Sequence, residues 1–405
     1  MADAPTARPG HGGRALDLVN FFLANVQTGF GPFVAVYLTA HKWTEGDIGL
    51  ALSVGTIVGV ASQLPAGALV DAARSKRVAA AAAIGGVIAA ALLLAVWPIT
   101  LAVLAAEAIH GLASSVLTPA IAALSLGLVG RAALGERLGR NASFGALGNG
   151  LAAAAMGAVG SVLGSRAVFW LTAVLGLPAL VALAAMGRAG GPAGAERGAS
   201  PGLDRRALAG LVADRRLVVF AGATVLFFLG NGAVLPLAAS LVTQQMGDRA
   251  SLIIAAAIVL PQAVVAVASS LVGRLAERVG RRPLLLLGWG ALPLPALLLV
   301  AQPGPAILLA GQTIGGISAA VVGVMLPLIA ADLTRERGHF NLCIGLFGLC
   351  AAAGATLSTA LAGAVADAAG NRIAFAGLAA VGLVGVALLW AAMPETRAGG
   401  APAPR

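Results

Sequence analysis

Glu107 and His110 are the two residues of this sequence whose types and spacing could carry out proton chemistry. They lie three residues apart in the apolar run 99–127, so in a helix they share one face. No Lys or Arg lies in that run, and an ionised carboxylate is costly in apolar surroundings, so a protonated Glu107 is accessible. We therefore predict that Glu107 carries a proton and that His110 modulates it.

The alternative for this pair is a structural role, in which Glu107 bonds to the backbone or to His110 and holds helices together. Gly111, Ser114 and Thr118 continue the same stripe at spacings of three or four residues. Such a stripe is typical of a helix face that meets either a cavity or a neighbouring helix.

Amide side chains form a second set of candidates, suited to hydrogen bonding with a substrate. Asn20 and Gln27 share a helix face, whereas Asn25 lies about 140° away at about 100° per residue. Asn231 repeats Asn25 after 206 residues, so a symmetric packing role for those two is the alternative to substrate contact. The predicted cavity residues are Asn20, Asn25, Gln27, Asn231 and Gln312.

Composition identifies the class of protein that must position these residues. Of the 405 residues 59% are hydrophobic and only 10% are charged, and the mean hydropathy is +0.94. A soluble protein of this length does not have such a composition. The apolar runs are long enough for a helix to cross a hydrocarbon core about 30 Å thick. The sequence therefore predicts an all-α polytopic membrane protein.

We predict twelve transmembrane helices in two six-helix bundles, 16–187 and 217–393. A linker, 188–216, joins the bundles, and tails 1–15 and 394–405 flank them. The expected spans are 16–40, 47–70, 78–97, 99–127, 141–165, 167–187, 217–243, 250–272, 284–301, 304–331, 340–366 and 371–393.

The placement of basic residues predicts the orientation. All but four of the 26 Lys and Arg residues fall in the two tails, the linker or alternate loops, and no Lys or Arg is expected within a span. The positive-inside rule then places both tails and the linker in the cytoplasm. The net charge of +10 is explained by these loops, so we predict a bilayer and not a nucleic acid as the charged partner.

One basic loop occurs twice. Residues 67–77 read GALVDAARSKR, and residues 273–283 read GRLAERVGRRP, with first glycines 206 residues apart. Twelve spans in two halves with this loop resemble the major facilitator superfamily, whose motif G-x-L-a-D-r-x-G-r-k lies between helices 2 and 3. The resemblance covers nearly the whole chain and implies that fold, transport by alternating access, and a monomer.

The resemblance also implies a cytoplasmic gate. In the family the acid equivalent to Asp71 binds the start of helix 11 and a basic residue at the end of helix 4, for which Arg131 is suitable here. The ending Pro394-Glu395-Thr396-Arg397 resembles the family's P-E-T-K/R, whose Glu can meet the second loop, at Arg274 or Arg281. The predicted gating residues are Gly67, Asp71, Arg74, Arg77, Arg131, Gly273, Glu277, Arg278, Arg281 and Glu395.

Two departures from the family limit what is carried over. The family's helix 4 often has R-x-x-q-G-x-g with a proton-coupling arginine, but here Glu107 stands at that position. A carboxylate-based coupling is therefore our own inference. The G-P-x-x-G-G signature of antiporters is absent, so export of a small organic molecule rests on how common exporters are in such chains.

Other functions remain as alternatives to proton-coupled export. Import or facilitated diffusion of a polar metabolite is the nearest, followed by a transport-dead receptor or a membrane-embedded enzyme. No H-E-x-x-H, G-x-S-x-G or phosphate loop occurs, so we expect neither an enzyme nor a cofactor, and we expect no metal site. The absence of Arg from the expected spans favours a cationic or neutral apolar substrate over an anion.

Overall fold

In the computed structural model, the described residues are 11–30, 32–43, 45–186, 205–246, 250–335 and 339–397. Their regular structure is helical: α1 (His11–Thr28), α2 (Pro32–Ala40), α3 (Glu45–Ala72), α4 (Lys76–Val96), α5 (Thr100–Val129), α6 (Leu134–Leu163), α7 (Ser165–Ala185), α8 (Arg205–Val212), α9 (Arg215–Asn231), α10 (Val234–Met246), α11 (Ala250–Val279), α12 (Arg282–Ala291), α13 (Pro293–Ala301), α14 (Pro305–Leu333), α15 (Phe340–Ala369) and α16 (Asn371–Ala392).

These helices supply 12 segments long and apolar enough to cross a membrane within the described ranges, which confirms the predicted number. Nine spans are single helices, and three consist of two helices each. One of the three, Arg282–Ala301, breaks between α12 and α13, where Pro293 begins the second helix. Proline cannot donate a backbone hydrogen bond inside a helix, so the chain restarts there.

The predicted linker and tails are only partly described. Residues 1–10, 187–204 and 398–405 lie outside the described ranges. The short helix α8 falls within the predicted linker, and its Leu211 is buried against the second half of the chain. The sequence predicts a tail over residues 1–15, whereas α1 begins at His11.

The expectation that no Lys or Arg lies within a span is wrong. Several of the 12 segments carry basic residues near their ends, and α6 is the case that bears on the cavity. This helix begins at Leu134, seven residues before the predicted start, and so includes Arg137 and Arg140. A hydropathy pattern does not detect the first two turns of α6, because they carry charged residues and the apolar run begins only after Asn141. Of these two arginines, Arg137 is buried in the helical bundle and Arg140 is half-buried.

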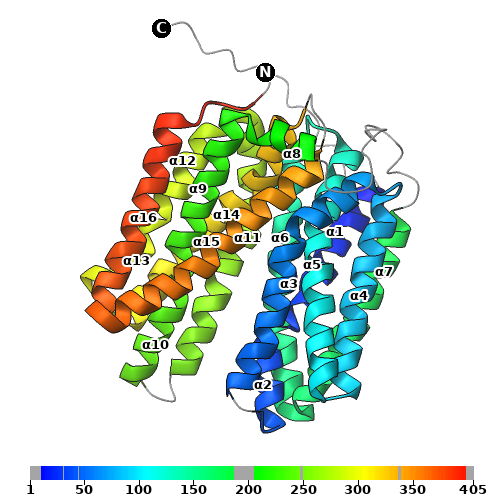
Figure 1. The fold of residues 1–405 in the computed structure, drawn as a ribbon, viewed down its shortest axis with the longest axis vertical. Helices are drawn as coiled ribbons and strands as arrows, with labels where there is room; N and C mark the ends of the chain where they lie inside the picture. Colours follow the sequence, from blue (N-terminus) through cyan, green and yellow to red (C-terminus); the bar gives the residue numbers. More distant parts are fainter. Residues whose placement is uncertain are drawn as a thin grey trace, which may run out of the picture.

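The chain folds into two halves that lie side by side (Figure 1). Both halves meet near the end at which α1 begins and α16 ends, here called the terminal end. The first half has a core of its own, whereas the second half's core also takes in Ala68, Ala122, Leu134 and Leu138 of the first. Helix α3 packs on α15, and α6 packs on α11, so these two pairs join the halves.

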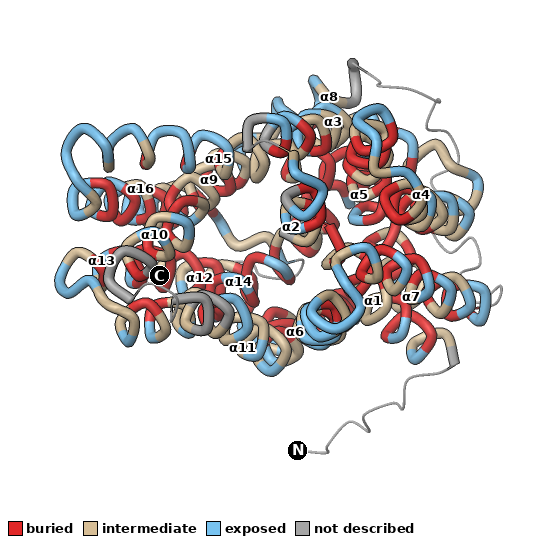
Figure 2. Tube along the Cα trace, turned by 90° about the horizontal axis from the view of Figure 1, so that it is seen from below, coloured by how far each residue is buried: buried red, intermediate tan, exposed pale blue. Residues whose placement is uncertain are grey.

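Many residues on the outside of each half are apolar. Seen end-on in Figure 2, buried residues face the interior of each helix cluster and exposed residues follow its perimeter. Large exposed side chains include Leu101, Val162 and Val267. A perimeter of this kind suits contact with lipid acyl chains, where apolar exposure has no cost.

Glycines allow the joining helices to approach closely at equivalent places in both halves. A Cβ on Gly67 of α3 would lie 2.9 Å from the carbonyl carbon of Asn341, and one on Gly273 of α11 would lie 2.9 Å from that of Gly135. Both distances are too short for real contacts, so only glycine fits. Because Gly273 follows Gly67 by 206 residues, as Asn341 follows Gly135, one contact is the symmetric copy of the other.

Within the first half, Gly148 of α6 packs directly on the backbone of α1, where a Cβ would overlap Phe21. We predict that Gly148→Ala lowers stability, since overpacking costs about 1–3 kcal/mol. Gly150→Ala, two residues on, meets open space and is expected to be neutral or mildly stabilising, because Ala favours helix. Thermal unfolding of the two variants in detergent compares them, and equal melting temperatures would contradict the prediction.

Candidate functional site

Asp71 lies at the end of α3 and accepts hydrogen bonds from the start of α15 in the other half. Its Oδ1 accepts from the backbone N–H of Asn341 at 3.1 Å and from Asn341 Nδ2 at 2.6 Å, and its Oδ2 accepts from the N–H of Leu342 at 2.9 Å. The first N–H groups of a helix have no partner within the helix and carry partial positive charge. The carboxylate of Asp71 therefore caps α15 across the boundary between the halves.

Glu277, at the end of α11, makes the reciprocal contact. Its Oε1 accepts from the backbone N–H of Gly135, in the first turn of α6, at 2.9 Å. Glu277 follows Asp71 by 206 residues, the same offset that relates Asn341 to Gly135. Each half thus supplies an acid that caps a helix of the other half.

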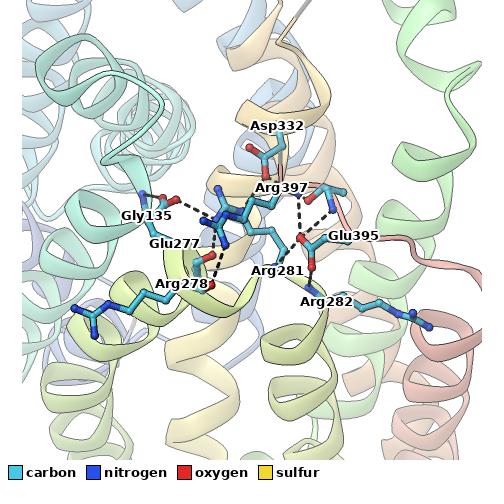
Figure 3. A network of polar contacts seen from close by, with 10 residues as sticks. Gly135, Glu277, Arg278, Arg281, Arg282, Asp332, Glu395 and Arg397 are labelled. Atoms are coloured by element: carbon cyan, nitrogen blue, oxygen red, sulfur yellow. Dashed lines mark hydrogen bonds and ion pairs between the residues drawn. The ribbon is translucent and has the colours of Figure 1, made fainter. Parts of the chain in front are cut away.

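The second acid belongs to a larger network (Figure 3). Arg281 is buried and pairs with Glu277 at 3.2 Å and with Asp332 of α14 at 3.0 Å. Glu395 accepts from the backbone N–H groups of Arg281 at 2.8 Å and Arg282 at 3.1 Å. The expected contact of Glu395 with the second loop therefore occurs at the main chain of Arg281.

Burial would raise the pKa of Glu395, but hydrogen bonds from the backbone N–H groups of Arg281, Arg397 and Arg282 outweigh it. The pKa of this carboxyl consequently lies below its ordinary value. The segment after α16 is further held by Arg397, whose guanidinium donates to the carbonyl of Arg278 at 2.8 Å.

Most other basic residues of the predicted gate lie near helix carboxyl ends. Arg131 follows α5 and donates to the carbonyl of Ala331, in the last turn of α14. Arg77 donates to the carbonyl of Ala184, at the end of α7, at 3.1 Å. Cations are favoured at these ends, where carbonyls lack helical partners. The side chains of Arg74 and Arg278 are exposed.

A cavity of about 360 Å³ lies between the halves, close to these contacts. Helices α1, α5 and α6 of the first half and α9, α14 and α15 of the second line it. Its polar residues all come from the first half, whereas the second half supplies an apolar wall. The polar residues are Asn20, Gln27, Thr118 and Asn141, and the apolar wall includes Phe228, Val322, Leu326, Pro327 and Ile344.

Of the predicted cavity residues, the structure places Asn20 and Gln27 in this lining. Asn25 is buried instead and donates to the carbonyl of Phe21 at 2.7 Å. Asn231 is exposed and Gln312 is half-buried, and neither lines the cavity. Asn25, which lies about 140° around the helix from Asn20 and Gln27, is thus on the face of α1 that packs against other helices.

Glu107 and His110 lie within the first half, away from the boundary between the halves. Glu107 is buried against α3 at Gly55, and His110 stacks on Phe30 with ring centroids 3.8 Å apart. Glu107 Oε1, His110 Nε2 and Ser114 Oγ are buried and have no hydrogen-bond partner among the described residues. Thr118 lies on the same face of α5, about two helical turns beyond His110, and lines the cavity.

Sequence reasoning missed an ionic cluster next to the cavity. Asp17 of α1 is paired with both Arg137 and Arg140 of α6. Arg137 Nε also donates to Asn141 Oδ1 at 2.8 Å, and Asn141 Nδ2 donates to Ser125 Oγ at 2.7 Å. Asp17 is the residue that could have indicated this cluster, because an acid inside an apolar span needs a basic or hydrogen-bonding partner.

We predict that the Glu395 contact is lost in acid. A carboxyl whose pKa is lower in the folded state contributes stability above its ordinary value of about 4.3, and the contribution is lost as pH falls through the folded pKa. Hydrogen exchange of the Arg281 and Arg282 amides, corrected for intrinsic rates, should therefore accelerate only at pH values below that ordinary pKa. Glu395→Gln should accelerate it at neutral pH, and unchanged exchange in that variant would contradict the assignment.

Comparisons with known proteins agree with this architecture. The family model described as Major Facilitator Superfamily matches residues 16–221 and 220–404. Two uncharacterized MFS-type transporters of Mycobacterium tuberculosis, MT2531 of strain CDC 1551 and Rv2456c of strain H37Rv, are each 34% identical over 406 residues, covering 98% of this chain and 96% of the relative.

The crystal structure of the human organic anion transporter MFSD10 (TETRAN) has the same fold. Its TM-score is 0.74 at 17% identity, and the match covers 94% of this chain and 100% of that one. The chain therefore belongs to the major facilitator superfamily and transports a small solute across a membrane, as a transporter and not an enzyme.

Proposed function

We propose that this chain is a proton-coupled exporter of a small organic molecule that works by alternating access, with both termini in the cytoplasm. The distribution of Lys and Arg supports that orientation. In it, the terminal end faces the cytoplasm, and the capped helices α6 and α15 close the cavity there. The described contacts then correspond to an outward-facing state, which opens inward when Asp71 and Glu277 leave their helices.

The observation that carries the proton-coupling part is the row of polar atoms on α5. Glu107, His110 and Ser114 follow one another on a single face, and each has a buried polar atom without a protein partner among the described residues. A buried polar atom without a hydrogen-bond partner costs free energy, and a row of such atoms is well suited to hold water or pass a proton. Thr118, on the same face, lines the cavity, which supports a path for protons between Glu107 and the substrate space.

In this proposal Glu107 is the proton carrier and His110 modulates it. An acid buried in an apolar bundle is easily neutralised, so loading and release of a proton change its charge. Glu107 lies against α3 at Gly55, and α3 also carries Asp71 to the terminal end. A change of charge at Glu107 therefore acts on a helix that takes part in closing the cavity.

Import or facilitated diffusion of a polar metabolite is the second candidate. The amides of Asn20 and Gln27 in the cavity favour it, because they can hydrogen-bond an uncharged polar solute. Counterflow that is independent of pH would support this alternative.

A transport-dead receptor would bind a ligand without flux.

We predict that Glu107→Gln abolishes transport driven by a pH gradient but leaves substrate exchange intact. Glutamine keeps the size and hydrogen-bonding capacity of a protonated Glu but cannot release a proton. The measurement is uptake and exchange in liposomes, with Asp367→Asn, an exposed carboxylate on α15, as the control. Full gradient-driven transport by Glu107→Gln would refute the assignment.

We also predict that Asp71→Asn favours opening of the terminal end. Each charge-assisted hydrogen bond contributes about 1.5–3 kcal/mol, so its loss should shift the equilibrium about tenfold or more. Spin labels at Ala132 and Val279, one in each half, should report a larger population at long distance. Glu136→Gln, an exposed acid at the same end, should leave the distance distribution unchanged, and an unchanged distribution in Asp71→Asn would argue against the gate.

A further inference from the structure

The ionic cluster of Asp17, Arg137 and Arg140 touches the wall of the cavity through Asn141. Arg137 is almost fully buried, with 4% of its surface exposed, and all three of its guanidinium nitrogens donate: to Asn141, to Asp17 and to the carbonyl of Gly13. Arg140 is partly exposed and lies over the ring of Phe144, 5.6 Å from its centroid. One carboxylate thus faces two guanidinium groups.

The second half has the same helices at this place but none of the charges. At an offset of 206 residues, Asp17, Arg137 and Arg140 correspond to Ala223, Cys343 and Leu346. Asn141 and Ser125 likewise correspond to Phe347 and Ala331. The ring of Phe347 packs on Phe220 with centroids 4.9 Å apart, so an apolar core joins α9 to α15.

This internal comparison indicates that a contact between these two helices does not require charges. An apolar core of similar volume is often as stabilising as a buried ion pair, because desolvation offsets much of the attraction between the ions. The second half joins the equivalent helices with such a core. The polar cluster of the first half is therefore best explained by what lies next to it, which is the cavity.

The cluster gives the neighbouring part of the cavity a positive character. Two guanidinium groups share one carboxylate, which leaves one net positive charge. Arg137 is buried, whereas the side chain of Arg140 is 35% exposed, so solvent screens part of that charge. Glu136, the acid next to Arg137 in sequence, also attracts its guanidinium, but its side chain is exposed at the terminal end, where solvent weakens this attraction. The residues that line the cavity carry no charge of their own. An anion in the cavity is thus favoured over a cation.

Hydrogen-bond donors are available in the same place. Asn141 uses one N–H for Ser125, and Asn20 uses one for the carbonyl of Leu16, so each amide retains a second N–H. Gln27 and Thr118 add an amide and a hydroxyl to the lining. Opposite them, Phe228, Val322 and Leu326 offer only apolar contact.

We propose that the substrate is a small organic anion whose carboxylate binds the polar wall at Asn141, with Arg137 behind it, while its apolar body lies against α9 and α14. This inference rests on the proposed transport function and names its substrate class. It reverses the preference for a cationic or neutral substrate, because that preference assumed that no Arg lies within a span. Arg137 positions Asn141 and supplies charge without touching the substrate.

Three matched probes test the proposal: 4-phenylbutanoate, 4-phenylbutanamide and 4-phenylbutan-1-amine. Thermal unfolding of the purified full chain is measured as each probe is titrated at neutral pH, since binding to the folded state raises the melting temperature. The carboxylate should bind at least about tenfold more tightly than the amide or the amine. Equal stabilisation by the three, or none by the carboxylate, would overturn the proposal.

The second half supplies the residues for the decisive variant. The triple substitution Asp17→Ala, Arg137→Cys, Arg140→Leu copies Ala223, Cys343 and Leu346, and it should fold yet lose the preference for the carboxylate by about tenfold. Arg166→Leu, which removes one positive charge at the opposite end, should keep that preference. A triple variant that still prefers the carboxylate would overturn the proposal.

A single substitution keeps the test decisive if the triple variant does not fold. Asn141→Asp preserves the size of the side chain and its contact with Arg137 but places a negative charge in the lining. It should weaken carboxylate binding and strengthen amine binding, because the charged group of the ligand binds at this residue, and unchanged affinities for both probes would overturn the proposal. These binding assays use no pH gradient, so their outcome does not depend on proton coupling. Anion binding without proton-driven transport would refute only the coupling, and proton-driven transport without anion binding would refute only the substrate class.

Discussion

The structure depends on a simple constraint: the first backbone N–H groups of a helix need acceptors. At the boundary between the halves these groups are buried among helices, where water cannot satisfy all of them. Asp71 and Glu277 supply the acceptors, and each does so for a helix of the other half. Contact between the halves therefore satisfies a need of the backbone that neither half meets from its own residues.

This arrangement explains why the close contacts and the acids occur together. A carboxylate reaches the backbone of the facing helix only if the two helices approach closely, which Gly67 and Gly273 allow. Around the acids the halves differ. Glu277 is embedded in a network with Arg281 and Asp332, while the first half places its buried charges around Asp17, beside the cavity. The two halves share a scaffold but place their buried charges differently.

Much of this could be predicted from sequence. The span count follows from apolar length, and the loop contacts of Asp71 and Glu395 follow from motifs that recur in the family. Arg137 could not be placed, because its position in a helix depends on where α6 begins, and the charged first turns of α6 resemble a loop. Whether Asn25 faces a cavity or a neighbouring helix likewise depends on helix rotation, which tertiary packing sets.

The exchange of caps also bears on how such a chain could arise. Each half offers one acid and requires one, and the offset of 206 residues makes the two contacts equivalent. A single half could satisfy both needs only by pairing with a second copy of itself about a two-fold axis, the geometry of an isologous dimer. Fusion of two copies would preserve both capping contacts and free each half to diverge elsewhere, as the cluster around Asp17 has done.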